Sequence, residues 1–305
     1  MTGLLKKTLV AGFIFIISAG SALAEEILMP FVLAGTSTGD VATVSAEVKS
    51  KLSGAGFEVV GEYSPYDGAN IIVVTSEHLK AEAAKSEFGG YGAMVRVSVT
   101  KNGDSTEIVY TNPIYMASAY RMTNDLHDVR AAVEGALGAK QDFGSEKNLT
   151  DKDLRDYHYT VMMEYFTDPS ELAEYDSQEE AVKAVEAGLA AGKGATSKVY
   201  RIDIPGKDET VFGVALKGKD AEDCSGDEFV MSRIDKATPR STPHLPYEIV
   251  VSDGTAYALF ARFRIAINWP HLPMVASSTG GTFMNIMCSP GAIEEALIQA
   301  AGGEL

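Results

Sequence analysis

The sequence predicts an α+β protein made of two similar units, each with the order β-α-β-β-α-β-β-α and an antiparallel sheet with helices on one face. Three observations support this prediction. Along the chain, segments whose apolar residues have the two-residue period of a strand alternate with segments that have the 3.6-residue period of a helix. The same succession occurs twice, about 140 to 160 residues apart. A tight-turn pair closes a hairpin in each half, Asn102-Gly103 in the first and Asp253-Gly254 in the second.

The first unit is expected over residues 25–137. Its strands are predicted at 31–36, 57–62, 70–75, 94–100 and 106–111. The first helix follows Asp40, where Val41, Val44, Val48 and Leu52 share one face, and it ends at Gly54 and Gly56. A second helix is expected at 77–87, and a closing helix places Leu126, Val129, Val133 and Leu137 on one stripe.

The polar segment 138–156 is predicted to be a linker, and the second unit is expected over residues 157–305. Its strands are predicted at 159–166, 199–204, 210–216, 247–251 and 255–267. Ser177 and Glu180 form a capping box for its first helix. Further helices are expected at 223–234 and from Ser289-Pro290 to Gly302.

Residues 1–24 are typical of an export signal. Lys6 and Lys7 give a positive start, an apolar run follows, and Ala22-Leu23-Ala24 supplies the small-residue cleavage pattern. We therefore expect a periplasmic or secreted protein that begins at Glu25. An uncleaved membrane anchor is the alternative, although the run is short for a bilayer span. No second apolar run approaches membrane-spanning length, so no transmembrane segment is expected after signal removal.

The composition limits the expected partners. The formal net charge is -16, and we find no basic patch, so nucleic acid and anionic membranes are disfavoured. Solubility is the simplest role for this acidity. A small molecule or a protein partner is expected instead, and a homodimer is kept as an alternative.

Three strings in the second half point to a known family. They run from Tyr247 through Phe263-Arg264-Ile265-Ala266 to Ser289-Pro290-Gly291-Ala292-Ile293. The pattern resembles exported bacterial proteins of the domain of unknown function 302 group, and residues 40–122 resemble the same unit more loosely. The resemblance implies small α+β domains that associate in pairs, here as an intramolecular pair. It implies no activity, cofactor or catalytic residue.

The candidate ligand-binding residues lie near one predicted strand. Arg262 and Arg264 are expected on one face of the strand 257–267, where two guanidinium groups can hold a carboxylate or phosphate. Asn268, Trp269 and His271 follow directly and complete the candidate site. A solvated sheet face that pairs with surface acids is the alternative.

The soft ligands His271, Met274 and Cys288 suggest copper, which favours imidazole and sulfur donors. Packing of the methionines in the core is the competing interpretation. Cys224 and Cys288 could also form a disulfide in an oxidising compartment, and this bond would remove the thiolate from the copper set. Free buried thiols are the third alternative.

The motifs of nucleotide and hydrolase chemistry are missing. Gly192-Lys193-Gly194 lacks the spacing of a phosphate loop, and neither G-x-G-x-x-G nor G-x-S-x-G occurs. The sequence therefore predicts a binding module for a small ligand or protein, with its site in the second unit or at the junction of the units. A hydrolase or isomerase that uses scattered carboxylates and Arg264 is one alternative, and a periplasmic copper-handling protein is another.

Overall fold

The computed structural model describes residues 25–161, 163–276 and 281–304. In these residues the chain is α+β, with two antiparallel sheets and helices on both. The predicted export signal, residues 1–24, lies outside the described residues. No helix in the part of the chain that the structure describes is long and apolar enough to cross a membrane.

The first sheet has the strand order β2-β3-β4-β5-β1-β6. Its strands are β1 (Phe31–Ser37), β2 (Glu58–Tyr63), β3 (Ala69–Thr75), β4 (Val95–Asn102), β5 (Ser105–Thr111) and β6 (Gln141–Phe143). The accompanying helices are α1 (Val41–Gly54), α2 (Glu77–Ala83), η1 (Gly89–Gly92), α3 (Pro113–Ala119), α4 (His127–Leu137) and α5 (Asp151–Arg155). Asp40 caps α1 by accepting a hydrogen bond from the Thr43 amide, which satisfies one of the free N–H groups of the first turn.

The second sheet has the order β7-β11-β10-β9-β8. Its strands are β7 (Ser170–Glu174), β8 (Thr196–Asp203), β9 (Glu209–Leu216), β10 (Tyr247–Ser252) and β11 (Thr255–Ala258). Its helices are α6 (Gln178–Ala190), η2 (Lys193–Ala195), α7 (Asp227–Ile234), η3 (Thr242–His244), α8 (Ala261–Asn268), η4 (Phe283–Ile286) and α9 (Ser289–Ala301).

The two sheets have corresponding strand orders. Read strand for strand, β2-β3-β4-β5-β1 in the first sheet matches β8-β9-β10-β11-β7 in the second. Each sheet also has a register shift in its edge strand at the same place. Gly61 follows the shift in β2 and pairs with Val73, and Tyr200 follows the shift in β8 and pairs with Gly213. These matches describe topology and register.

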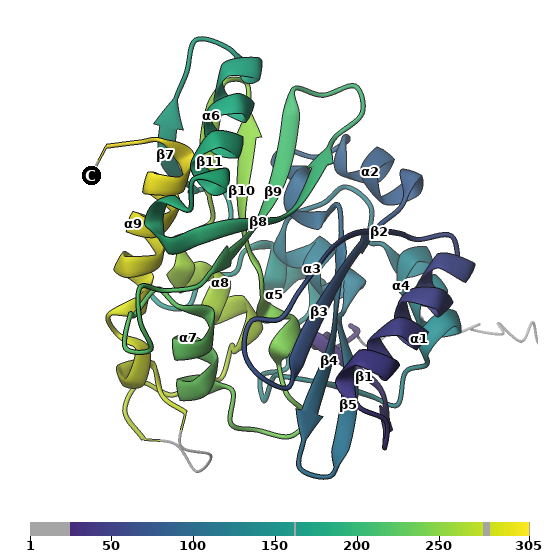
Figure 1. The fold of residues 1–305 in the computed structure, drawn as a ribbon. Helices are drawn as coiled ribbons and strands as arrows, with labels where there is room; N and C mark the ends of the chain where they lie inside the picture. Colours follow the sequence, from purple (N-terminus) through teal and green to yellow (C-terminus); the bar gives the residue numbers. More distant parts are fainter. Residues whose placement is uncertain (1–24, 162, 277–280, 305) are drawn as a thin grey trace, which may run out of the picture.

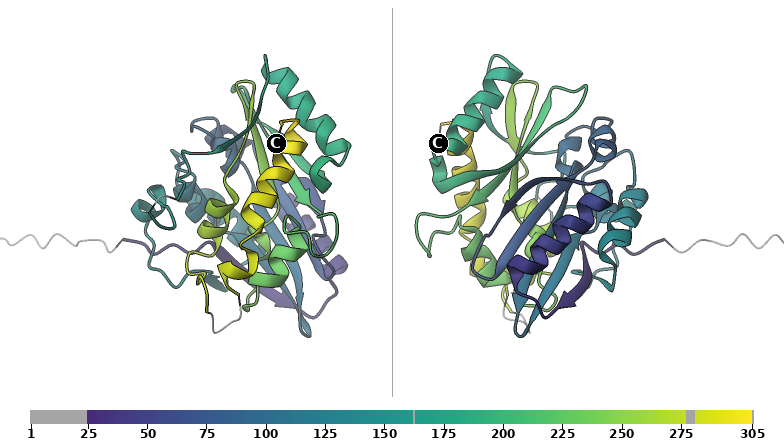
Figure 2. Two further views of the ribbon diagram at one scale, coloured as in Figure 1. Left: turned by 90° about the vertical axis from the view of Figure 1, so that its left-hand side faces the viewer. Right: turned by 45° about the vertical axis from the view of Figure 1, so that its right-hand side comes forward.

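Each sheet is covered by helices on one face and turns its other face to the other unit. α1 and α4 pack on the first sheet and α6 and α9 on the second, so the helix layers lie on opposite sides of the molecule. Figure 2 shows α1 lying across the first sheet in its right-hand view. Between the sheets, β2 contacts β8, η1 packs on β9 and β10, and η3 packs on β3, β4 and β5. The buried charged residues Arg96, Arg264 and Glu248 lie in this region.

Two predicted elements are wrong, and one helix is missing from the prediction. The described residues of the range 159–166 form no strand, and the strand in this part of the chain is β7, which begins at Ser170. The predicted strand 255–267 is β11 followed by the helix α8, seven of whose eight residues are buried. A helix that is buried on nearly every side shows no 3.6-residue period of apolar and polar residues. Its Ile and Phe residues are also common in strands, so the segment resembles a strand. The fully buried helix α3 was not expected, for the same reason.

The predicted linker is folded onto the first unit. Its β6 pairs with β1, and its α5 packs against α3. Thr150 and Asp153 form a capping box at the start of α5. The segment therefore belongs to the sheet and helix layer that precede it.

Candidate functional site at the junction of the units

A cavity of about 440 Å³ lies where the predicted linker meets the second unit. Its apolar lining includes Phe143, Ile234, Pro239, Trp269, Leu272 and Pro273, and its polar lining includes Gln141, Ser145, Glu146, Thr238, Ser241 and His271. The lining comes from β6 and the loop after it, from the end of α7 and the loop after it, and from the segment after α8. Two of the sequence-predicted residues, Trp269 and His271, therefore share one cavity wall.

His271 is half-buried and is held as a neutral imidazole. Burial lowers its pKa, although nearby Glu146 and a hydrogen bond to the Gly144 backbone act in the opposite direction. A hydrogen bond that raises the pKa of histidine is one that the ring donates, so the Gly144 carbonyl accepts it. Among the described residues Nδ1 has no hydrogen-bond partner. Nδ1 is therefore a buried acceptor that the described part of the chain leaves unpaired.

Trp269 connects the cavity with the interior. Its side chain is 5 % exposed, and its ring centroid lies 4.7 Å from that of His244. His244 Nε2 and Tyr247 Oη are 3.0 Å apart, and burial lowers the pKa of His244 well below its usual range. This histidine is therefore neutral and structural. The His244 ring packs against Trp269, and Trp269 also lines the cavity.

A buried ionic network lies behind this aromatic wall. Arg264 donates from Nη2 to the carbonyls of His244 (2.9 Å) and Pro246 (2.7 Å) and forms an ion pair with Glu248. The guanidinium carbon also lies 5.4 Å from the ring centre of Tyr247. Glu248 accepts a second ion pair from Arg96 of β4 at 2.6 Å. The network therefore crosses from the second unit to the first.

The structure separates the two arginines of the candidate site. The prediction that Arg262 and Arg264 share a strand face is wrong, because both lie on the helix α8. Arg262 is 43 % exposed and pairs with Glu164. Arg264 is buried, and Asn268 is buried beside it, donating to the Arg264 carbonyl at 2.8 Å. Residues two apart on a helix point in different directions, so the two guanidinium groups cannot hold one anion.

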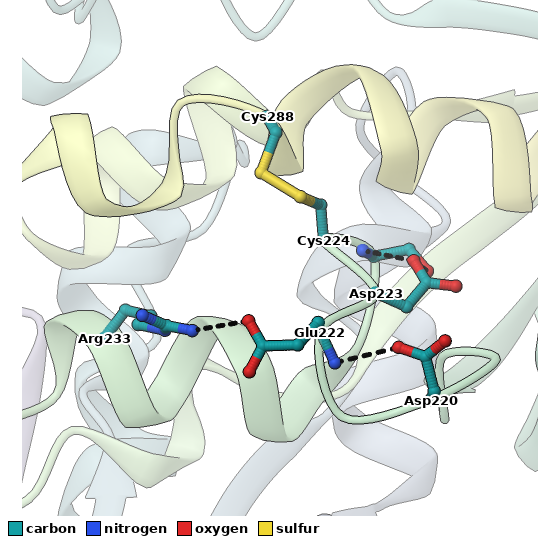
Figure 3. Close-up of a disulfide and its surroundings, with 7 residues drawn as sticks. Asp220, Glu222, Asp223, Cys224, Arg233 and Cys288 are labelled. Carbon is teal, nitrogen blue, oxygen red and sulfur yellow. Dashed lines mark hydrogen bonds and ion pairs between the residues drawn. A yellow bond between two sulfur atoms is a disulfide. The ribbon is translucent and has the colours of Figure 1, made fainter.

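Cys224 and Cys288 form a disulfide with a Cα–Cα distance of 5.8 Å (Figure 3). It ties the loop before α7 to the start of α9. Asp223 accepts hydrogen bonds from the Ser225 amide and hydroxyl, and Arg233 of α7 pairs with Glu222 at 3.0 Å, which orders the loop on both sides of Cys224.

The disulfide removes the thiolate from the predicted copper ligands. Cys288 is bonded to Cys224, and Met274 is 46 % exposed on the segment after the cavity wall. Within residues 25–161, 163–276 and 281–304, no group of three or more His, Cys, Asp or Glu side chains could hold a metal ion. His271 and Met274 alone supply too few soft donors for the predicted copper site.

Sequence reasoning missed Arg96, His244 and Glu248. Each stands in a stretch that resembles an ordinary strand or loop, and their convergence depends on contacts between the two units. One signal was available, because Arg96 and Glu248 are charged residues in the middle of otherwise apolar strands. Such residues are seldom buried unless they are paired.

No family model matches the chain, and the comparisons with curated proteins and with solved structures find no match either.

Proposed function

We propose that the protein binds a small organic molecule in the junction cavity, and that this molecule is uncharged or cationic and carries a ring. The observation that carries the proposal is the cavity of about 440 Å³ at the junction of two units, with Trp269 on its wall. Ligand sites typically have volumes of about 300 to 1,000 Å³, apolar and aromatic linings and a few fixed polar groups.

The charges in the lining favour a neutral or positive ligand. Glu146 is the one carboxylate among the lining residues, and neither Lys nor Arg is among them. His271 adds no charge because burial lowers its pKa. An anionic ligand would meet the carboxylate of Glu146 and the overall charge of -16. Lys147, whose charge acts on His271, is not among the lining residues. Apolar rings would pack against Trp269 and Leu272.

A binding role fits the burial pattern better than catalysis. The ionisable groups behind the aromatic wall include Glu248, Arg264 and His244, and each of these three is at most 3 % exposed. A catalytic group has to reach its substrate at hydrogen-bond distance. The cavity itself offers one imidazole and one carboxylate as titratable side chains.

The single tryptophan of the chain makes the proposal directly testable. Because Trp269 is the one tryptophan, the tryptophan emission of the protein reports this wall alone. Three probes of similar size differ in charge: benzylamine, benzyl alcohol and benzoate. We expect benzylamine and benzyl alcohol to change the emission saturably at millimolar concentrations, as is usual for ligands of so few atoms, and benzoate to bind more weakly.

A matched pair of variants separates cavity binding from surface effects. Ala237 is exposed and lines the cavity, so Ala237→Phe fills its mouth. Ala132 is equally an exposed alanine, on α4, and Ala132→Phe serves as the control. We expect Ala237→Phe to weaken binding about tenfold or more, which corresponds to about 1.4 kcal/mol, and Ala132→Phe to leave it unchanged. Equal responses of the two variants, or the tightest binding by benzoate, would contradict the proposal.

We also propose that the two units are copies of one duplicated α+β domain, of the kind found in the domain of unknown function 302 group. The matching strand orders and register shifts support this proposal. An experimental structure tests it. The two sheets, matched strand for strand, should superpose with their outer helices on the same face.

Export to the periplasm or beyond is part of the same proposal, because the disulfide needs an oxidising compartment. The denatured mass of protein from a secreting host should correspond to a chain that begins at Glu25. A mass that retains the first 24 residues would contradict export with cleavage.

A further inference from the structure

Buried positive charge exceeds buried negative charge in the ionic network between the units. Arg96, Arg264 and Glu248 have side chains that are 3 %, 1 % and 2 % exposed. Two guanidinium groups thus share one carboxylate. Arginine keeps its proton even when it is buried, and an uncompensated buried charge is costly.

Two further buried carboxylates lie near this network. Glu209 is already paired with Lys207 at 2.8 Å, so Asp227 is the one that offsets part of the excess. Asp227 lies at the start of α7, and its Oδ2 accepts from the Leu216 amide and from the Tyr63 hydroxyl, both at 3.1 Å. Burial raises its pKa to about 7, although the charge of Arg264 acts in the opposite direction. At neutral pH this carboxyl is therefore ionised for part of the time. His244 adds no charge because its pKa is lowered.

Arg264 also has hydrogen-bond donors without a partner in the described residues. Its Nη2 makes the hydrogen bonds to His244, Pro246 and Glu248, whereas Nε and Nη1 have no partner among the described residues. Three N–H bonds of a fully buried guanidinium are therefore left without an acceptor in the part of the chain that the structure describes. Buried donors are normally satisfied, so their environment calls for a further acceptor.

Tyr200 supplies another unsatisfied donor on the same surface. It stands in one cross-strand row with Gly213 and Glu248, so the side chains of Tyr200 and Glu248 share a sheet face. Its ring lies across Gly213, where an added Cβ would stand 2.0 Å from the Tyr200 Cε1 atom. The ring therefore extends toward Glu248, and its hydroxyl is buried without a partner in the described chain.

Tyr91 approaches from the first unit. It lies in η1, which packs on β9 and β10, and its ring contacts Tyr120 and Phe166 at centroid distances of 6.1 and 6.0 Å. Its hydroxyl likewise has no partner among the described residues. Burial raises the pKa of both Tyr91 and Tyr200 well above the usual value. Both hydroxyls therefore keep their protons and can donate.

We propose that a small monovalent anion, chloride in the first place, binds between the two units, where it accepts hydrogen bonds from Arg264 and from the hydroxyls of Tyr91 and Tyr200. Water would satisfy some of these donors but would leave the second guanidinium without a counter-charge. The surrounding residues are sealed from solvent, so a compact inorganic anion fits better than an organic one. The anion acts as a structural ligand that joins the units.

The test measures thermal stability while chloride replaces gluconate at constant ionic strength. An anion that binds the folded state alone stabilises it by mass action, so we expect Tm to rise saturably, by about 2 °C or more. Gluconate is too large for a sealed site. A Tm that does not depend on chloride would overturn the proposal and would leave water as the occupant.

Three conservative variants locate the effect. Tyr91→Phe and Tyr200→Phe each remove one proposed donor and keep the ring, and we expect each to reduce the chloride-dependent rise in Tm at least twofold. Tyr115→Phe is the control, because Tyr115 is buried but its hydroxyl already donates to the Ile267 carbonyl at 2.8 Å. It should lower Tm and keep the full chloride response. An unchanged response in both test variants would place the effect elsewhere and overturn the proposal.

Diffraction from crystals soaked in bromide gives an independent readout that needs no variant. We expect an anomalous peak beside Nε and Nη1 of Arg264. Bromide peaks confined to the surface would contradict the proposed site.

Discussion

Arg96 and Glu248 occupy corresponding positions in the two sheets and form a buried ion pair with each other at 2.6 Å. The strand register shows this correspondence. In the first sheet, Arg96 pairs with Val73, which pairs in turn with Gly61. In the second sheet, Glu248 pairs with Gly213, which pairs in turn with Tyr200. Gly61 and Tyr200 also meet across the junction. At both positions the two units carry complementary residues, a cation against an anion and a glycine against a tyrosine. The contact surfaces of the two units are therefore complementary to each other and not identical.

Replacement of Glu248 should destabilise the protein more than replacement of Arg96. Glu248 is the shared partner of Arg96 and Arg264, so Glu248→Gln leaves two buried guanidinium groups without a carboxylate. We expect a loss of about 3 to 5 kcal/mol in the free energy of unfolding. Arg96→Met leaves Glu248 paired with Arg264 and should cost less than about 2 kcal/mol. Urea unfolding of both variants measures the difference, and the reverse order would show that Arg96 rather than Glu248 dominates the network.

Gly61 should tolerate no side chain. A Cβ at Gly61 would lie 2.6 Å from the Val199 carbonyl oxygen and 2.9 Å from the Tyr200 Cβ, so backbone atoms would have to move. We expect Gly61→Ala to cost about 1 to 3 kcal/mol of unfolding free energy.

Gly35 in β1 is the matched control for Gly61. An added Cβ there meets nothing within 4 Å. Gly35→Ala should be neutral or stabilising by about 0.4 to 1 kcal/mol. Chemical denaturation of the two single variants checks the prediction, and equal losses would mean that the contact of β2 with β8 does not limit packing at Gly61.

The disulfide should contribute substantially to stability, because it joins Cys224 and Cys288, which are 64 positions apart in the sequence. The chain-entropy relation gives about 4 kcal/mol for a loop of this length. We expect the Cys224→Ala/Cys288→Ala variant to unfold at a correspondingly lower urea concentration. Reductant should destabilise the wild type and leave the variant unchanged. Equal stability of oxidised wild type and variant would contradict this prediction.

The sequence predicted the outer helices because each has one buried face. It predicted the central strands, which are buried on both faces, from short runs of β-branched residues between turn residues. β3, β4, β5, β9 and β10 and the amphipathic helices α1, α4 and α6 lie close to their expected bounds. The error at α8 has the opposite cause, since a helix buried on nearly all sides has no polar stripe to mark its period. Burial therefore limits the prediction in two ways. It removes the helical period of α8, and it brings together charged residues whose contacts the sequence pattern does not indicate.

The candidate site was predictable in part. Trp269 and His271 were named from local composition, and both line the junction cavity. The other lining residues come from segments far apart in the sequence, such as β6 and the end of α7, and local pattern says nothing of their meeting. The buried partners of Arg264 depend on the packing of the two units in the same way.

Stability should fall as the pH rises from about 4 to about 7, in part because of Asp227. Burial raises its pKa in the folded state from 3.8 to about 7, so over this range the folded protein holds a proton that the unfolded chain has released. The contribution of Asp227 is therefore full below the unfolded pKa and is lost as the pH rises through the folded pKa, with a slope of up to about 1.4 kcal/mol per pH unit.

The variant Asp227→Asn isolates this contribution to the pH dependence. Asparagine keeps an oxygen for the Leu216 amide and the Tyr63 hydroxyl but carries no titrating group. Asp235, whose pKa burial also raises, and His244, whose pKa burial lowers, titrate in wild type and variant alike. The difference in unfolding free energy between the two proteins should therefore change with pH through Asp227 alone. We expect the unfolding free energy of the variant to rise relative to that of the wild type from pH 4 to 7, as measured by urea unfolding at each pH. A constant difference would show that Asp227 is ionised throughout this range, and that its negative charge balances Arg264 in the folded protein.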